Sequence, residues 1–369
     1  MSSGSTRDTT GERSSRRPIP RRPISRRTVA GRLSALAAVA ATASLALAAC
    51  GSSGSATPSA STSGSGKPLS IAYLSFAVEN SYDAPMLAAA QAVAADNNAT
   101  LKVFDANNSP QTQYSQLQDV INSGQYQGII LQPIFGTGLI SLVKQAIAKG
   151  IKVVNMDQIL GPDLSTDKPQ VAGLSANVTF VPTDIGTKLG NLVVQACKSR
   201  NLNPCKVGYL YDIKASALDV AISGAFNKAI AADPSVKVVA QGQSFFSPTV
   251  GLTAVQNMLQ ATPGLNLIVG SDQGIEGGSQ AVQSAHLTGK VILVGYGASA
   301  AALAGVSSGA WYADVAQAPA SEGRLAVQAL VKALRTGKDS GGIDPVALLP
   351  NGGVVTKANV SQFTAEWPG

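Results

Sequence analysis

The chain has 369 residues, which is long enough for two domains. Hydrophobic residues make up 45% of it and charged residues only 13%, a composition that supplies a large buried core and excludes a chain disordered throughout. The net charge of +7 lies in residues 1–49, which hold nine arginines and two acidic residues. The rest of the chain carries 19 basic and 19 acidic side chains, so no net electrostatic reason to expect DNA or RNA binding remains.

Residues 1–49 have the layout of a secretion signal. An arginine-rich stretch ends at Arg32, and an apolar run of Ala, Leu and Val follows it to residue 49. The run closes on Leu47-Ala48-Ala49-Cys50, which resembles the lipobox of bacterial lipoproteins. That resemblance implies that Cys50 is lipidated through its thiol and becomes the mature N-terminus. A transmembrane helix is the alternative, but the run is short for a bilayer span of about 20 residues.

The segment that follows the cysteine is almost entirely Ser, Gly, Thr and Ala up to residue 67. Such a composition has nothing to pack and behaves as a flexible tether. We therefore expect residues 50–67 to hold a globular body off a membrane, with the protein anchored through Cys50 to the outer face of the cell membrane.

The body from residue 68 alternates strand-like and helix-like segments. Apolar runs rich in β-branched residues indicate a first series of strands at 70–75, 100–105, 128–132, 152–156 and 171–174. Apolar residues at helical spacing predict helices at 85–97, 113–123, 139–149 and 185–198. Strands that alternate with helices in this way are typical of parallel α/β sheets.

A second series repeats the pattern. It predicts strands at 206–211, 237–243, 265–270, 291–295 and 311–316, and helices at 216–232, 249–261, 277–285 and 320–335. Two such series predict an α/β fold with two doubly wound parallel-sheet lobes joined by a multi-strand hinge. We expect residues 68–176 with 318–343 in the N-terminal lobe and 177–317 with 344–369 in the C-terminal lobe. Ligands bind at the carboxyl ends of such strands, and two lobes can close on a solute.

Two cysteines remain in the body. Cys197 and Cys205 flank a short loop between a predicted helix end and a predicted strand. Export places them where disulfides persist, so a disulfide is one interpretation and two reduced, partly buried thiols the other. No histidine lies nearby, which argues against a zinc site, and we expect no metal or other cofactor.

The order and spacing of several short motifs resemble one protein family. These motifs are Asn80-Ser81-Tyr82, Gly150 to Asp157, Gly270-Ser271-Asp272, Val294 to Gly297 and Ala313 to Pro319. The chain resembles the sugar-binding type I periplasmic-binding-protein family, whose best-known members are ribose-binding proteins. The resemblance implies a monomeric, non-enzymatic solute-binding protein that captures a sugar or another small polar molecule and delivers it to an ABC permease.

The resemblance also implies ligand contacts in the N-terminal lobe. Asn80 and Tyr82 match the amide and the aromatic ring of the first loop, and Asp157 matches the acceptor of sugar hydroxyls. Asp83 stands where a second aromatic residue is usual, and it either caps the following helix or contacts the ligand. Gln158 occupies a position that often holds arginine in the family.

The C-terminal lobe departs more from the family. The helix arginine is absent near residue 219, where Asp219 is a candidate to face the cleft instead, and Ser271-Asp272 replaces the family's Asn-Asp pair. Gln317 matches well, and Phe246 is either an aromatic wall or a core residue. Because an arginine and an acid are missing together, the identity of the solute is not inherited from the family.

Rival interpretations have little support. The single histidine, His286, sits at a predicted helix end, so His-based triads are excluded. The segment Gly295 to Ala300 fits a relaxed dinucleotide-binding pattern, which leaves a nucleotide-dependent exported enzyme as a weak alternative. A lipid-anchored sensor that reports to a membrane signalling partner stays open.

Overall fold

The computed structural model describes residues 66–369, which form two lobes, each built on one six-stranded sheet. The strand orders are β2-β1-β3-β4-β5-β11 and β7-β6-β8-β9-β10-β12. The predicted α/β class with two parallel-sheet lobes is therefore confirmed. The predicted signal segment, Cys50 and nearly all of the tether lie outside the described residues.

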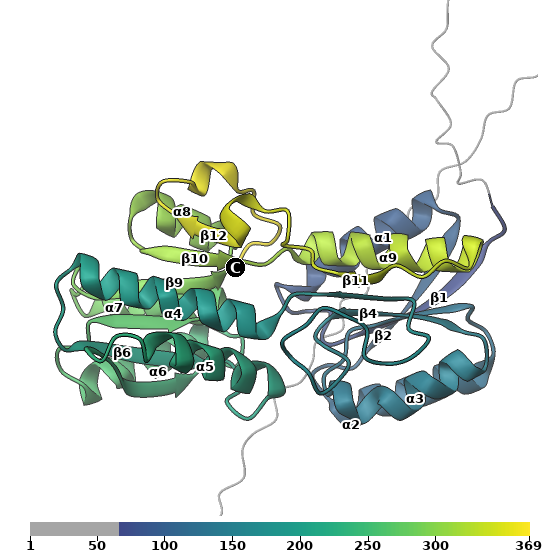
Figure 1. The fold of residues 1–369 in the computed structure, drawn as a ribbon, viewed down its shortest axis with the longest axis horizontal. Coiled ribbons are helices and arrows are strands. Elements are labelled where there is room, and N and C mark those ends of the chain that lie inside the picture. The colour runs from purple at the N-terminus through teal and green to yellow at the C-terminus, as the bar shows by residue number, and fades with distance from the viewer. Residues whose placement is uncertain (1–65) are drawn as a thin grey trace, which may run out of the picture. The chain divides into compact units, whose positions relative to one another are not determined.

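The N-terminal lobe is a parallel sheet between two layers of helices. Its strands are β1 (Leu69–Ser75), β2 (Ala99–Asp105), β3 (Gly128–Leu131), β4 (Lys152–Asp157), β5 (Ala176–Thr179) and β11 (Gly341–Ile343). Its helices are α1 (Asp83–Asp96), α2 (Pro110–Ser123), α3 (Gly136–Ala148) and α9 (Pro319–Thr336). Helices α1 and α9 pack on one face of the sheet, and α2 and α3 pack on the other (Figure 1). Since both faces are covered, central strands such as β3 are buried along their whole length.

The C-terminal lobe repeats this arrangement. Its strands are β6 (Cys205–Tyr211), β7 (Val236–Gln243), β8 (Leu267–Gly270), β9 (Ile292–Gly297), β10 (Ala313–Ala316) and β12 (Val354–Thr356), of which β12 runs antiparallel to β10. Its α-helices are α4 (Pro182–Ser199), α5 (Ala217–Ile230), α6 (Pro248–Ala261), α7 (Asp272–Ser284) and α8 (Ala300–Ser308). Two 3-10 turns, η1 (Pro350–Gly353) and η2 (Val360–Gln362), flank β12.

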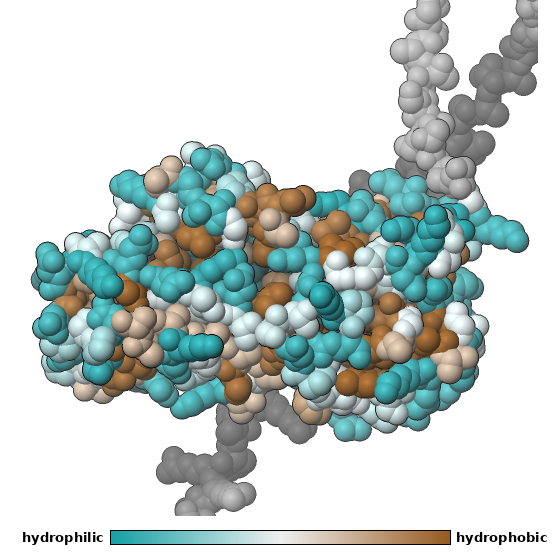
Figure 2. Space-filling view, viewed as in Figure 1, coloured by the Kyte–Doolittle hydropathy of each residue, from teal (hydrophilic) through white to brown (hydrophobic). Residues whose placement is uncertain are grey.

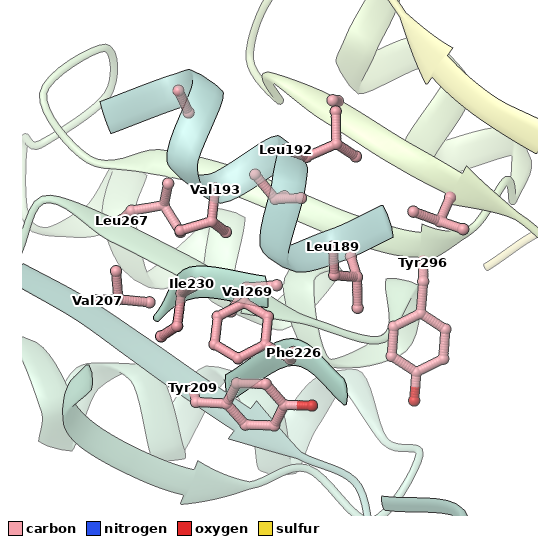
Figure 3. Packing of buried hydrophobic residues seen from close by; sticks show 14 of the residues in the cluster. Leu189, Leu192, Val193, Val207, Tyr209, Phe226, Ile230, Leu267, Val269 and Tyr296 are labelled. Atoms are coloured by element: carbon pink, nitrogen blue, oxygen red, sulfur yellow. The ribbon is translucent and has the colours of Figure 1, made fainter. Parts of the chain in front are cut away.

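The core under α4 and α5 is the larger of the two in this lobe. Phe226 of α5 packs against Tyr209 of the sheet with ring centroids 5.0 Å apart, and Leu189 of α4 and Tyr296 of β9 belong to the same cluster (Figure 3). Helices α6, α7 and α8 cover the opposite face. The chain passes between the sheets after β5, after β10 and after β11, which supplies the multi-strand hinge.

One predicted strand is wrong. Residues 171–174 form a turn in which Gly173 has a φ of 83°, and the strand of this sheet is β5, which follows it. Val171 and Leu174 are apolar because both are buried in the core, and burial alone does not distinguish a turn from a strand. Strand β5 pairs with β4, so the N-terminal lobe extends to Thr179, beyond the predicted boundary at residue 176.

Helix starts are the other systematic difference. The second and fourth helices are predicted to start at residues 113 and 185, but α2 and α4 begin at Pro110 and Pro182. Proline suits the first helical position because the missing N–H would have no partner there. Helix α8 and strands β11 and β12 were not predicted.

Cys197, near the end of α4, and Cys205, at the start of β6, form a disulfide, and both are buried. Among residues 66–369 no helix combines the length and the apolar character that a membrane span requires. On the face drawn in Figure 2, apolar residues form separate small patches among hydrophilic ones.

Close packing of α4 on α5 provides a stability test. A Cβ atom added to Gly186 would lie 2.1 Å from the carbonyl oxygen of Ile222, so Gly186→Ala forces the two helices apart. We expect the free energy of unfolding to fall by about 1–3 kcal/mol, as for other overpacked sites. Urea unfolding followed by circular dichroism measures the change.

Gly224→Ala is the matched control, because an added Cβ on this α5 residue meets open space. Alanine is the better helix former, so this variant should gain about 0.5–1 kcal/mol. Equal stabilities of the two variants would contradict the close helix contact.

Candidate functional site

The carboxyl ends of strands from both sheets border one cleft. Its apolar and aromatic walls are formed by Phe76, Tyr82, Phe180, Leu218, Phe246 and Tyr296. Its polar lining is formed by Asn80, Asp83, Gln132, Asp157, Gln158, Ser271, Gln273 and Gln317. The space between these walls, including the part open to solvent, is about 490 Å³. The lobes also meet directly at the cleft, where Gln273 Nε2 donates to Ser81 Oγ at 3.5 Å.

Eight of the ten residues predicted to contact a ligand line this cleft. They are Asn80, Tyr82, Asp83, Asp157, Gln158, Phe246, Ser271 and Gln317. They come from both lobes and are spread over more than two hundred positions of the sequence. These residues are far apart in the sequence, and the structure brings them together because most of them lie at the carboxyl ends of strands.

Asp219 lies outside the lining and stabilises a loop instead. Its two carboxylate oxygens accept from the backbone N–H groups of Asp212 at 3.2 Å and Ile213 at 2.8 Å. The Ser216 hydroxyl donates to it as well, at 3.2 Å. The neighbouring residue Leu218 takes the cleft position that was expected for Asp219.

Asp272 is also absent from the lining and is fully buried beneath it. Its Oδ2 accepts from Ser299 N at 2.7 Å, and Asp314 Oδ1 accepts from Ala298 N at 2.8 Å. The other oxygens of these two acids face the backbone of Gly295, where an added Cβ would lie 2.3 Å from Asp314 and 2.6 Å from Asp272. Burial raises the pKa of both carboxyl groups.

The same contacts account for the glycine pattern at 295–300. Gly295 makes room for the two buried acids, Gly297 lies against Trp367, and Ser299 caps α8 by accepting from Ala302 N. The glycine spacing is therefore explained by internal packing, without a dinucleotide.

Gln132, at the end of β3, organises the N-terminal side of the cleft. Its Nε2 donates to Asp83 Oδ1 at 2.7 Å and to Asp157 Oδ2 at 3.1 Å, while its Oε1 accepts from Phe76 N at 2.9 Å. The backbone donor sets the orientation of the amide, so both N–H groups are directed at carboxylates. Asp83 therefore contributes to the cleft, and helix α1 begins after Tyr82 without a side-chain cap.

Burial controls the charge of these acids. It raises the pKa of Asp83 to about 8, with a further rise from the Asp157 charge, and it raises the pKa of Asp157 to about 7. Glu322, in the first turn of α9, is fully buried and accepts from Tyr82 Oη at 3.0 Å. Burial raises the pKa of Glu322 well above its usual range, and the Asp157 charge adds to the effect.

Asp212, at the end of β6, organises the opposite side. This fully buried carboxylate accepts from the hydroxyls of Ser244 at 2.5 Å, Ser271 at 2.6 Å and Tyr296 at 2.6 Å. Burial and the charge of Asp219 raise the pKa of Asp212 to about 6. Two of its three donors line the cleft, so Asp212 fixes the position of a serine and a tyrosine that face the ligand space.

Left-handed backbone occurs at two of the strand ends. Asp157 has a φ of 66°, and Phe245 and Phe246 have φ values of 51° and 53°. Such conformations are uncommon for residues other than glycine and concentrate at ligand-binding sites. Phe246 lines the cleft, whereas Phe245 is 55% exposed.

The C-terminal segment joins the site in a way that no sequence signal indicated. The Trp367 ring meets Tyr82 edge to face, with ring centroids 5.3 Å apart, and its Nε1 donates to the carbonyl of Gly297 at 2.8 Å. Glu366 accepts from the backbone N–H of Ser321 at 2.7 Å. The last residues of the chain therefore support the aromatic wall of the cleft.

Comparisons with known proteins agree with this architecture. A family model described as a periplasmic binding protein domain matches residues 71–339. The D-allose-binding periplasmic protein of Escherichia coli K12 is 28% identical over 62% of this chain and 72% of its own length. The ribose import binding protein of Bacillus subtilis 168 is 29% identical over 62% of this chain and 69% of its own length.

Solved structures share the fold. An ABC transporter periplasmic solute-binding protein from Actinobacillus succinogenes with bound D-allose superposes with a TM-score of 0.69 at 24% identity, over 80% of this chain and 100% of that one. A solute-binding protein from Bacillus halodurans with bound myo-inositol has a TM-score of 0.68 at 21% identity, over 82% of this chain and 99% of that one.

The buried acids predict an inverse dependence of stability on pH. The folded state keeps protons on Asp83 and Asp157 that the unfolded state releases near pH 3.8, so stability present at low pH is lost as the pH rises toward 7–8. For Asp157 alone the loss is on the order of 4 kcal/mol. We expect the ligand-free protein to melt several degrees lower at pH 8 than at pH 5, as measured by scanning calorimetry.

Asp157→Asn isolates this contribution, because the amide has the same size but does not ionise. Its melting temperature should fall less between pH 5 and pH 8 than that of the unmodified protein. Asp119→Asn, at an exposed site on α2, serves as the control and should retain the full dependence. An identical pH profile for the Asp157 variant and the unmodified protein would refute the assignment.

Proposed function

We propose that this chain, which belongs to the periplasmic binding protein family, is the solute receptor of an ABC importer. It binds a sugar or sugar-like polar molecule in the interlobe cleft. One observation carries this proposal. The cleft combines aromatic walls with amide, hydroxyl and carboxylate groups at the strand ends of both lobes. The names of the allose-binding and ribose import relatives support a sugar-like solute.

Both kinds of lining suit a polyhydroxylated ring. The faces of Tyr82 and Phe246 offer flat apolar surface to the C–H groups of such a ring. The side chains of Asn80, Gln158 and Gln317 each supply donors and an acceptor, which matches hydroxyl groups that also do both. No covalent step is needed, so we assign a binding role.

Closure of the lobes follows from the division of the contacts. Asn80 and Asp157 belong to the N-terminal lobe, whereas Phe246 and Ser271 belong to the C-terminal lobe. A solute reaches both sets only when the lobes approach each other, so binding favours the closed form. The three chain crossings between the sheets form the hinge on which this motion depends. The closed form then docks on the permease.

The predicted anchor completes the proposal. Lipidation of Cys50 and the Ser/Gly-rich tether would hold the receptor at the outer face of the membrane, within reach of the permease.

Solute binding is tested by isothermal titration calorimetry of the exported protein, purified in detergent, against D-allose, D-ribose and myo-inositol. We expect one of these solutes to bind and Asp157→Ala to weaken its binding at least about tenfold, because a buried acceptor is lost. Asp119→Ala, which changes an exposed acid outside the cleft, should bind with unchanged affinity.

Small-angle X-ray scattering then tests closure. The radius of gyration should decrease when the bound solute is added and should not change for the Asp157→Ala variant at the same solute concentration. A tightly bound solute that leaves the scattering profile unaltered would contradict an interlobe site.

The anchor is tested by Cys50→Ala. The variant should move from the membrane fraction to the soluble fraction and lose incorporation of radiolabelled palmitate, because the thiol that carries the lipid is absent. Ser52→Ala, two positions away in the tether, should remain in the membrane fraction. A palmitate-free protein in both cases would refute lipidation.

A further inference from the structure

In the part of the chain that the structure describes, the carboxyl groups that line the cleft have no basic side chain beside them. Asp83 and Asp157 line it, and no lysine, arginine or histidine of the described residues does. Glu322 lies directly behind the aromatic wall, bonded to Tyr82 Oη. The Asp157 charge acts on both Asp83 and Glu322, so the three acids form one electrostatic cluster. Within residues 66–369, no basic side chain acts appreciably on the carboxyl groups of Asp83, Asp157 or Glu322.

The protein donors near this cluster, in the described part of the chain, leave some of its carboxylate oxygens without a hydrogen bond. Asp157 is 5% exposed, and its Oδ2 accepts from Gln132, but its Oδ1 has no protein donor among the described residues. Glu322 Oε2 is buried and also has no partner there. Both N–H groups of the Gln132 side chain are already engaged. Buried carboxylates nearly always have donors, so Asp157, which lines the cleft, has an oxygen available to accept a hydrogen bond from a solute.

A metal ion is a poor candidate for that donor. No three acidic, histidine or cysteine side chains of the described residues come close enough to hold a metal ion. An organic ammonium group fits better, since it supplies three N–H donors and a positive charge. The walls favour it too, because the faces of aromatic rings such as Tyr82 and Phe246 attract cations.

We propose that the solute bound in this cleft carries a protonated amine, as an amino sugar or an aminocyclitol does, and that Asp157 pairs with that amine. This inference rests on the proposed function, since it names the chemical class of the same solute. The pair would be a charge-assisted hydrogen bond, which is shorter and stronger than a bond from a neutral hydroxyl.

The electrostatics of the cleft agree with this assignment. Burial without an opposite charge raises the pKa of Asp83 to about 8 and that of Asp157 to about 7. A bound ammonium group would stabilise the ionised carboxylates and offset their repulsion, whereas a neutral hydroxyl would leave the repulsion in place. The free energy of binding is therefore expected to be more favourable for a cationic solute than for its uncharged analogue.

Matched ligand pairs test the proposal by isothermal titration calorimetry of the exported protein at pH 7. The amines are D-glucosamine, D-galactosamine and scyllo-inosamine, and the neutral partners are D-glucose, D-galactose and scyllo-inositol. Each pair differs by one amino group in place of one hydroxyl. We expect the amine of at least one pair to bind at least about tenfold more tightly than its partner. N-acetyl-D-glucosamine, which keeps the nitrogen without the charge, should not show this gain.

Variants then locate the charge. Asp157→Asn should reduce the ratio of amine to neutral affinity at least about tenfold, because the amide retains hydrogen bonding but not the charge. Asp119→Asn, exposed on α2, should leave the ratio unchanged. Melting curves check the fold of each protein, and Asp83→Asn replaces Asp157→Asn if the latter does not fold.

The outcomes separate this inference from the proposed function. Neutral partners that bind as tightly as the amines, or more tightly, would overturn the amine assignment and leave a sugar receptor in place. A preference for amines that persists unchanged in both cleft variants would overturn the role of the acids. If none of these sugars and cyclitols binds, the proposed sugar-like solute itself fails, and this inference fails with it.

Discussion

A buried carboxyl group needs a hydrogen-bond donor, and in this protein the hydrogen bonds to buried carboxyl groups fix the loops around the cleft. Asp212 takes three side-chain hydroxyls, Asp219 takes two backbone N–H groups, and Asp272 shares a backbone turn with Asp314. Each acid holds a strand-end loop in place. Asp157, which accepts from Gln132 through Oδ2, keeps its Oδ1 without a donor among the described residues, and it lines the cleft.

This distribution makes the two sides of the cleft chemically different. The C-terminal side presents Ser271 and the Tyr296 ring, both held by the buried Asp212, together with Phe246. The N-terminal side presents carboxyl groups held by one amide, Gln132. A solute bound as proposed would meet a preorganised neutral wall and an acidic wall. Preorganisation lowers the cost of ordering these groups when the solute binds.

Cleft-lining residues that follow a strand in a recognisable motif were predicted from the sequence, and those that depend on distant partners were not. Asn80, Asp157 and Gln317 stand at strand ends within such motifs and line the cleft. Gln132 also follows a strand, but nothing in its neighbourhood shows that it bonds acids 49 and 25 positions away. Asp219 and Asp272 lie near the predicted positions along the chain, yet their carboxylates accept hydrogen bonds from backbone N–H groups inside the lobe and do not line the cleft.

The alternation of apolar runs with amphipathic stretches determined by itself the α/β class, the two lobes and the strand ends on which a site could form, because these follow from local periodicity and burial. Tertiary structure alone decided which polar groups line the cleft and which form hydrogen bonds inside the lobes. Trp367 illustrates the point, since the last residues of the chain support a ring near its beginning. Hydrogen-bond satisfaction depends on neighbours in space, and the order of residues along a chain does not reveal them.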